Sequence, residues 1–414
     1  MLQPYRDDFN ARFTPQAYAS LLERLNAATR TKIEFRVSET PVFFPPALLD
    51  EMVETGRILT DQLVGNPTYM RASDASIPER YRVPNESPHP NFMTVDFGLA
   101  RDAAGNLTPK LVELQAFPSV FGYQDLLSRQ YIESYGLAPG LDWYLGGHDQ
   151  RSYWELLGKV IVSGHDPEHV VLAEVEPEAQ KTLPDFHVHA DRLGIAIVDI
   201  AQLSKQGNRL FYQRNGRSIP IARIYNRAIV DEIERKHVQL AFDYRDPLDV
   251  EWAGHPNWYF RISKFSLPWL YHPSVPPAVF LDEWFRGATR LSAGPDRKRI
   301  PADRDRILLK PLYSFAGKGI QFAPSDAELN AIPKADRHNY LLQERMRFEP
   351  VIATPHGMTQ AEVRILYSWP ENRSEMVPMI SLVRLGRGLM MGVDHNRNRE
   401  WVGGSAALFP THAS

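Results

Sequence analysis

The 414-residue chain has no cysteine, no large excess of charge of one sign and no long apolar run. Without cysteine it can form no disulfide, no thiolate-bound zinc or iron–sulfur site and no cysteine nucleophile. Its 47 Lys and Arg nearly balance its 50 Asp and Glu, so the net charge of −3 gives no electrostatic support for a nucleic-acid partner. No apolar segment approaches the roughly 20 residues of a membrane span, and the polar start is unlike a secretory signal. We therefore expect a cytoplasmic protein that binds neither nucleic acid nor membranes.

The composition that is present, 43% hydrophobic and 23% charged residues, is that of a globular protein with two or three packed units. Apolar positions at helical spacing predict amphipathic helices over residues 14–29 and 47–64. Residues 92–100 and 109–117 read as two strands joined by an Asp/Gly/Asn-rich turn, which predicts a hairpin.

Strand and helix patterns alternate from about Tyr153, which predicts a small α/β unit with a mostly parallel sheet. A stretch rich in Asp, Pro, Gly and His at residues 243–258 marks its end. The last third contains several strand-like segments and a glycine loop, and we expect an antiparallel sheet there. The fold class predicted from these patterns is mixed α+β and α/β.

The sharpest local motif is ILLKPLYSFAGKGI at residues 307–320. An apolar strand presents Lys310, and a small flexible turn follows, in which glycines permit close approach of a phosphate and lysines neutralise its charge. The backbone N–H groups that could contact a phosphate belong to Ser314, Ala316, Gly317, Lys318 and Gly319. The motif matches neither GxxxxGK[ST] nor GxGxxG, so an ordinary glycine hairpin is the alternative interpretation.

The residues around this loop follow an order that resembles the ATP-grasp superfamily. Lys264 comes first, then Lys310 and the loop, then the pair Gln343-Glu344, and last Glu362 and Arg364. The resemblance implies that Lys264 and Lys310 bind the phosphates of ATP and that the loop covers them. It also implies that the adenine lies against a hinge of Gln343, Glu344, Arg345 and Met346.

The hairpin supplies a candidate metal site. Asp96 and Glu113 are nearly equidistant from the turn, so an antiparallel register places them opposite each other, with Gln115 on the same side. Carboxylate and amide oxygens suit Mg²⁺ bound to ATP phosphates. An acidic hairpin that precedes the lysines is similar to the circularly permuted ATP-grasp family, which includes glutathionylspermidine synthetase-like ligases. Gln115 stands where that family usually has Asn, which lengthens the amide side chain by one methylene group.

The resemblance implies an ATP-grasp fold of circularly permuted order and three units. Residues 1–150 would hold the helices and the metal hairpin, residues 151–255 an α/β unit of the substrate-binding type, and residues 256–414 the nucleotide-binding lobes. The implied activity is that of an ADP-forming carbon–nitrogen ligase: a small-molecule carboxylate is activated by ATP and Mg²⁺ as an acyl phosphate, which an amine then attacks.

Three further residues are candidates for catalysis within this interpretation. Arg364 and Arg384 would stabilise the transferring group, since a guanidinium binds phosphate or carboxylate at two points, and Asn396 would position the acyl phosphate. The alternative for Arg364 is an ion pair with Glu362 on one strand face, and for Arg384 a solvated charge on an edge strand. Two other functions use the same cradle: phosphoryl transfer to another acceptor, and nucleotide binding without turnover.

Overall fold

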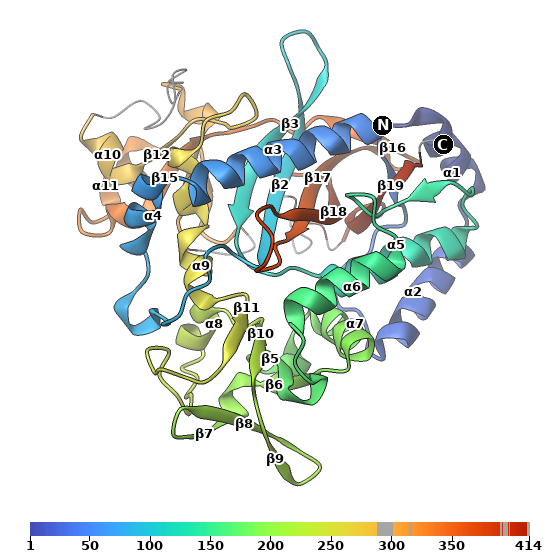
Figure 1. Cartoon of the computed structure of the whole chain (residues 1–414). Coiled ribbons are helices and arrows are strands. Elements are labelled where there is room, and N and C mark those ends of the chain that lie inside the picture. The colour runs from blue at the N-terminus through green and yellow to red at the C-terminus, as the bar shows by residue number, and fades with distance from the viewer. Residues whose placement is uncertain (288–300, 314–316, 390, 392–395, 397, 412–414) are drawn as a thin grey trace.

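The structure, a computed structural model, describes residues 1–287, 301–313, 317–389, 391, 396 and 398–411. In this part of the chain helices surround four β-sheets, so the protein has a mixed α+β fold (Figure 1). The described residues contain no helix that is both long and apolar enough to cross a membrane.

The largest sheet joins an early hairpin to the end of the chain. Its strands are β1 (Val42–Phe43), β2 (Phe92–Arg101), β3 (Leu107–Gln115), β4 (Leu141–Asp142), β16 (Pro350–Thr354), β17 (Gly357–Ser368), β18 (Val377–Gly386) and β19 (Gly403–Pro410). They run in the order β1-β19-β18-β17-β2-β3, with β16 added beside β17 and β4 beside β19. The hairpin therefore forms one end of this strand order, and β2 joins it to β17, a strand that comes more than 200 residues later in the chain.

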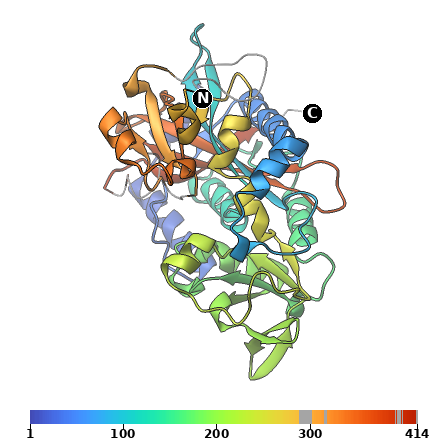
Figure 2. The same cartoon turned by 90° about the vertical axis from the view of Figure 1, so that its left-hand side faces the viewer.

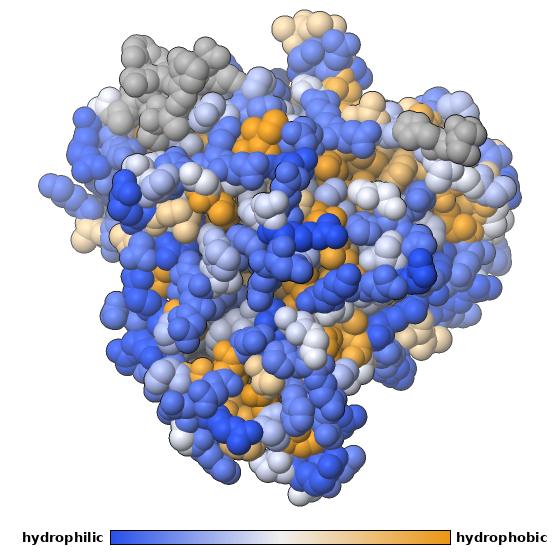
Figure 3. All heavy atoms as spheres, in the orientation of Figure 1, coloured by the Kyte–Doolittle hydropathy of each residue, from blue (hydrophilic) through white to orange (hydrophobic). Residues whose placement is uncertain are grey.

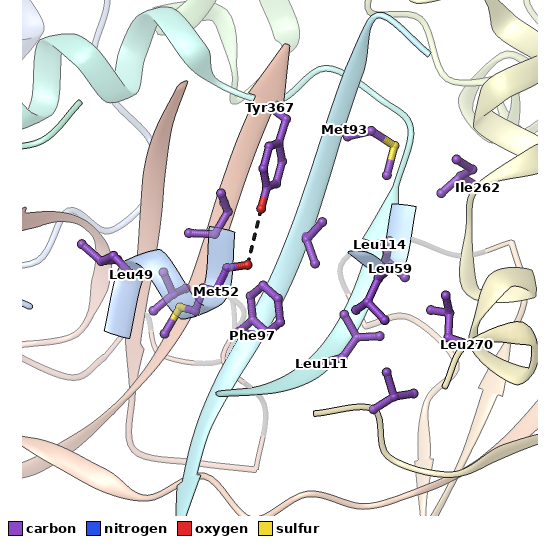
Figure 4. Packing of buried hydrophobic residues seen from close by; sticks show 14 of the residues in the cluster. Leu49, Met52, Leu59, Met93, Phe97, Leu111, Leu114, Ile262, Leu270 and Tyr367 are labelled. Carbon is purple, nitrogen blue, oxygen red and sulfur yellow. Dashed lines mark hydrogen bonds between the residues drawn. The ribbon is translucent and has the colours of Figure 1, made fainter. Parts of the chain in front are cut away.

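Strand periodicity gives this sheet two different faces. On one face, Val95, Phe97 and Ile365 are fully buried and belong to the same apolar cluster as Met52 of helix α3 (Pro46–Val64) (Figure 4). The hydroxyl of Tyr367 on β17 donates to the backbone oxygen of Val53 in α3, at 2.8 Å. Gly56 in α3 leaves room for this ring, because a Cβ atom there would lie 2.2 Å from the Tyr367 hydroxyl oxygen. The next residue along each strand points to the opposite face.

The predicted alternation after Tyr153 is present as a parallel sheet in the order β11-β10-β5-β6. Its strands are β5 (Val170–Glu174), β6 (Ala196–Asp199), β10 (Arg223–Asn226) and β11 (Glu251–Ala253), with helices α6 (Gln150–Ile161), α7 (Leu183–Leu193) and α8 (Val230–Arg235) beside them. A three-stranded antiparallel sheet extends from it, formed by β7 (Ser204–Gln206), β8 (Arg209–Arg214) and β9 (Arg217–Pro220). Both views place this region at the lower end of the molecule (Figures 1 and 2).

A second antiparallel sheet lies in the upper half of the molecule (Figure 2). Its strands β12 (Ala278–Phe280), β13 (Ile307–Pro311), β14 (Gln321–Phe322) and β15 (Tyr340–Glu344) have the order β12-β15-β13-β14. Leu309 and Leu342 on its outer face pack with Leu329 of helix α11 (Asp326–Ala331) and, beside it, with helix α10 (Leu281–Phe285). The expectation of one antiparallel sheet in the last third was wrong, because β16 to β19 belong to the large sheet, where β17 pairs with β2 of the early hairpin.

The remaining helices cover the large sheet and its edges. They are α1 (Gln3–Arg12), α2 (Pro15–Thr29), α4 (Pro67–Asp74), α5 (Phe121–Tyr135) and α9 (Pro256–Arg261). Helix α2 begins as predicted after Thr14, whose side chain accepts a hydrogen bond from the Ala17 N–H at 3.2 Å. The face of the molecule drawn in Figure 3 is mostly hydrophilic, with apolar residues visible in separate groups.

Candidate functional site

A cavity of about 610 Å³ lies between the inner face of the β12–β15 sheet and the polar face of the large sheet. This volume is within the range of small-molecule sites in proteins. The β12–β15 sheet contributes Lys310 and Gln343 to its wall, and the large sheet contributes Glu113, Glu362 and Arg384. Residues from both ends of the chain therefore face one space.

An ion network occupies the floor of the cavity on the side of the large sheet. Asp96 of β2 is 1% exposed and accepts two hydrogen bonds from Arg364 of β17, at 2.6 and 2.7 Å, and one from Arg384 of β18 at 2.5 Å. Arg384 also pairs with Glu362. The strand register explains these contacts, since Arg364 lies opposite Asp96 and Arg384 lies opposite Glu362.

The two buried carboxyl groups of this network differ in their electrostatics. Burial alone would raise the pKa of Asp96, but the guanidinium groups of Arg364 and Arg384 bring that pKa below its ordinary value. Burial raises the pKa of Glu362, with further contributions from the negative charges of Asp96 and Glu113, and Arg384 opposes the rise. Asp96 is therefore an anion held between two cations, whereas burial and the neighbouring carboxylates disfavour the charged form of Glu362.

Two buried lysines face the network from the other side. Lys264 begins the 3-10 helix η5 (Lys264–Trp269), and its Nζ lies 3.5 Å from Oε2 of Glu113. Lys310 donates from Nζ to the backbone oxygen of Val112, at 3.4 Å, and both lysines are 4% exposed. Burial, together with the nearby charge of Lys264, lowers the pKa of Lys310 to about 8, and the carboxylate of Glu113 opposes the shift.

The hinge residues and part of the glycine loop also reach the cavity. Gln343, Glu344 and Met346 line it, and the carboxylate of Glu344 pairs with Arg306. Gly317 lines it as well, whereas Lys318 and Gly319 are exposed. Gly319 has φ 73°, and a Cβ atom there would lie 2.8 Å from the Pro311 ring. The other two loop residues of the prediction, Ser314 and Ala316, lie outside the described residues.

Besides Lys318 and Gly319, two further described candidates, Asp96 and Asn396, do not line the cavity. Asp96 lies behind its two arginines. Asn396 is 1% exposed, and its Oδ1 accepts from the backbone N–H of Arg387 at 3.4 Å, so its side chain supports the turn after β18. Gln115 does line the cavity, two residues beyond Glu113 on the same strand.

An apolar part of the wall was missed from the sequence. Leu308, Ile320 and Phe322 line the cavity from the β13–β14 side. Phe348 and Met391 line it as well, as does Met346 of the predicted hinge. The alternation along β13 contained the signal for one of these residues, since Leu308 is two positions before Lys310 and must share its face. The cavity wall therefore contains apolar side chains as well as charged ones.

The oxygen atoms in the wall fit a hydrated magnesium ion better than a fully protein-bound metal. The described residues contain no cluster of three or more His, Cys, Asp or Glu side chains that could hold a metal ion. Glu113, Gln115 and Glu362 nonetheless face the cavity. Mg²⁺ commonly takes one or two carboxylates and completes its shell with water and substrate phosphates. The donor set is therefore suitable for Mg²⁺ that arrives with a polyphosphate.

Comparison with known proteins gives a likeness of fold and none of sequence. No protein-family model matches the chain, and no curated protein matches it. Among solved structures, the chain is similar to a glutathione synthetase-like effector from Globodera pallida, determined in the apo form. The two chains are 12% identical, the alignment covers 95% of this chain and 99% of the other, and the TM-score is 0.56. The chain thus resembles this effector in overall fold over nearly its whole length.

Proposed function

We propose that the protein is an ATP-dependent carboxylate–amine ligase with a circularly permuted ATP-grasp fold. The observation that carries this proposal is the meeting of Lys264 and Lys310 with Glu113, Arg364 and Arg384 in one cavity between two sheets. Four cationic side chains face three carboxylates in this network, those of Asp96, Glu113 and Glu362, which leaves one formal positive charge. Such a surplus in a buried site favours a polyanionic ligand.

The cavity wall offers apolar side chains for a base and cationic side chains for phosphates, the two groups that a nucleotide presents. The apolar wall beside Gln343 and Met346 suits the base, and Lys310 and Lys264 suit the phosphates. Glu113 and Gln115 would hold Mg²⁺ together with those phosphates, and the ion would neutralise part of their charge. Asp96, with both oxygens engaged by guanidinium groups, would fix Arg364 and Arg384 in position.

In the proposed reaction the substrate carboxylate attacks the γ-phosphorus of ATP, and the bond to the bridging oxygen breaks to release ADP. The amine then attacks the acyl phosphate and displaces inorganic phosphate. Arg364 and Arg384 would neutralise the approaching carboxylate and the transferring phosphoryl group, because both are anions that otherwise repel each other. Residues 1–150 and 256–414 would form the nucleotide-binding part, with residues 151–255 on the substrate side.

One observation favours a second candidate, nucleotide binding without turnover. Arg364 and Arg384 already occupy both oxygens of Asp96, which leaves fewer free carboxylates for a metal ion than the hairpin sequence suggested. A protein of this kind would bind ATP through the same lysines and release it unchanged.

The test is to incubate the purified protein with ATP, Mg²⁺ and pooled carboxylic acids and amines, and to measure ADP release and new amide masses. ADP that forms only when an acid and an amine are both present supports the ligase. ADP formed with a hydroxyl acceptor or water alone supports phosphoryl transfer, and binding with no ADP supports the second candidate. Glu113→Gln is the matched control, and it should bind nucleotide weakly and form no amide.

A further inference from the structure

Gln343 is a polar residue in an otherwise apolar row of the inner sheet face. The register of the β12–β15 sheet places four residues side by side, one on each strand: Ala278, Gln343, Leu308 and Phe322. Leu308, Phe322 and Gln343 all line the cavity. A glutamine in this row makes the cavity wall less apolar, so packing alone does not explain why a carboxamide is present there.

The carboxamide of Gln343 is buried and incompletely satisfied. The residue is 2% exposed, and its Nε2 has no hydrogen-bond partner among the residues that the structure describes. A buried donor without an acceptor costs free energy, and a leucine or methionine would fill the same volume without that cost. The group is therefore placed for an acceptor that a ligand brings.

The distance between Gln343 and Lys310 along the sheet indicates which part of a bound nucleotide would lie next to Gln343. Lys310 is two residues from Leu308 on β13, so it lies about 7 Å along the strand from the row that contains Gln343. A nucleotide whose phosphates contact Lys310 would place its base over Leu308 and Phe322. The edge of that base would then face the carboxamide.

We infer that Gln343 reads the N6/N7 edge of adenine and thereby selects a purine nucleotide with a 6-amino group; this inference rests on the proposed nucleotide site. A carboxamide presents one acceptor and two donors, and rotation about its last bond exchanges them. Its oxygen accepts from the N6 amino group while its nitrogen donates to N7, the pairing by which glutamine recognises adenine elsewhere. Hydrogen bonds from the hinge backbone to adenine would not depend on the side chain at this position. The contact inferred here depends on the carboxamide of Gln343.

The test compares ATP with 7-deaza-ATP, which lacks the N7 acceptor, by isothermal titration calorimetry in the presence of Mg²⁺. Wild-type protein should bind ATP about tenfold more tightly than 7-deaza-ATP, because one buried hydrogen bond is lost. Gln343→Met keeps the length and apolar packing of the side chain, and should bind the two nucleotides equally well. Thermal denaturation of the variant checks that its fold is unchanged.

Gln360 provides a matched control. It also lines the cavity, but its Nε2 already donates to the backbone oxygen of Phe348 at 3.2 Å. Gln360→Met should therefore keep the wild-type preference for ATP. A preference that persists in Gln343→Met, or that is lost in Gln360→Met instead, overturns the inference and leaves the nucleotide site standing. Failure of wild-type protein to bind either nucleotide overturns the nucleotide site itself.

Discussion

The two faces of the large sheet use the same strands for opposite purposes. On the face toward α3, Val95, Phe97 and Ile365 are 0% exposed and surrounded by apolar side chains. One position away along the same strands, Asp96 and Arg364 form the ion network beneath the cavity. Each charged residue thus has an apolar neighbour on either side in sequence that anchors the backbone. The apolar core and the charged cavity wall thus lie on opposite faces of the same strands, because successive residues of a strand point to alternate faces.

The largest effect should come from the apolar face. Phe97→Ala removes a ring that is packed between Leu111 and Val363 on neighbouring strands, and should lower the free energy of unfolding by about 3–5 kcal/mol. Urea denaturation measures this loss. At low temperature, where the variant remains folded, ATP should still bind, because no cavity residue has changed. A loss of less than 1 kcal/mol would mean that the two faces are not divided in this way.

The next prediction compares the loss of stability caused by replacing each of two acidic residues that lie opposite each other in the hairpin. Asp96→Asn removes the charge between two buried guanidinium groups and should cost about 3 kcal/mol of unfolding free energy. Glu113→Gln should cost less than Asp96→Asn, because Glu113 is partly exposed and pairs with one cation, Lys264 at 3.5 Å, rather than two. Both variants should lose turnover. Denaturation curves for the pair, measured beside amide formation, distinguish a carboxylate that holds the arginines from one that acts in the cavity.

Equal stability of Asp96→Asn and wild type would contradict the idea that this carboxylate holds the two arginines in place. A large loss in Glu113→Gln would instead show that Lys264 depends on its carboxylate partner for folding. Either result would change how much of the protein's stability is assigned to the polar face of the large sheet, relative to its apolar face.

The hairpin itself could be predicted because its information is local. Alternation and the turn residues between the strands indicate β2 and β3, and equal distance from the turn pairs Asp96 with Glu113. The structure adds a bulge, since the register shifts between Asp96 and Phe97. Helices α2 and α3 and the parallel sheet were likewise visible in periodicity.

The partners of Asp96 could not be predicted from the sequence. Asp96 and Arg364 are 268 positions apart, and no local pattern specifies which distant strand lies beside β2. For the same reason the strands of the last third were assigned to one sheet, although they divide between two. The order of the lysines and the hinge, interpreted through a family resemblance, predicted several residues that line the cavity. That Nε2 of Gln343 is a buried donor without a hydrogen-bond partner among the described residues can be recognised only in the structure, because it depends on burial and strand register.

Replacement of Lys310 should have a smaller effect on stability than the changes above, and it should affect stability and ATP binding in opposite directions. Lys310 is buried and its pKa is lowered to about 8, so the folded state is least favourable at low pH, where the group is charged. Stability should therefore rise as the pH increases from about 8 toward the unfolded value of 10.5. Lys310→Met should stabilise the protein at pH 7 by about 1–3 kcal/mol, yet weaken ATP binding about 100-fold.

Thermal denaturation at pH 7 and calorimetric titration with ATP measure the two changes. Lys318→Met is a useful control, because Lys318 is exposed and its loss should leave stability unchanged. A Lys310→Met variant that is less stable than wild type and binds ATP normally would show that Lys310 is a packing residue.

The smallest expected effect is a pH dependence of ATP affinity that arises from Lys310 in the cavity wall. With a pKa of about 8, Lys310 is mostly charged at pH 7 and mostly neutral at pH 9, so the affinity of wild-type protein for ATP should fall about tenfold over this range. Near pH 8 the bound phosphates should raise the pKa of Lys310, and binding should take up protons, which titrations in buffers of different ionisation enthalpy detect. Lys310→Arg, charged throughout this range, should flatten the profile. The same slope in both proteins would assign the titration to another group and break the link between burial of Lys310 and phosphate binding.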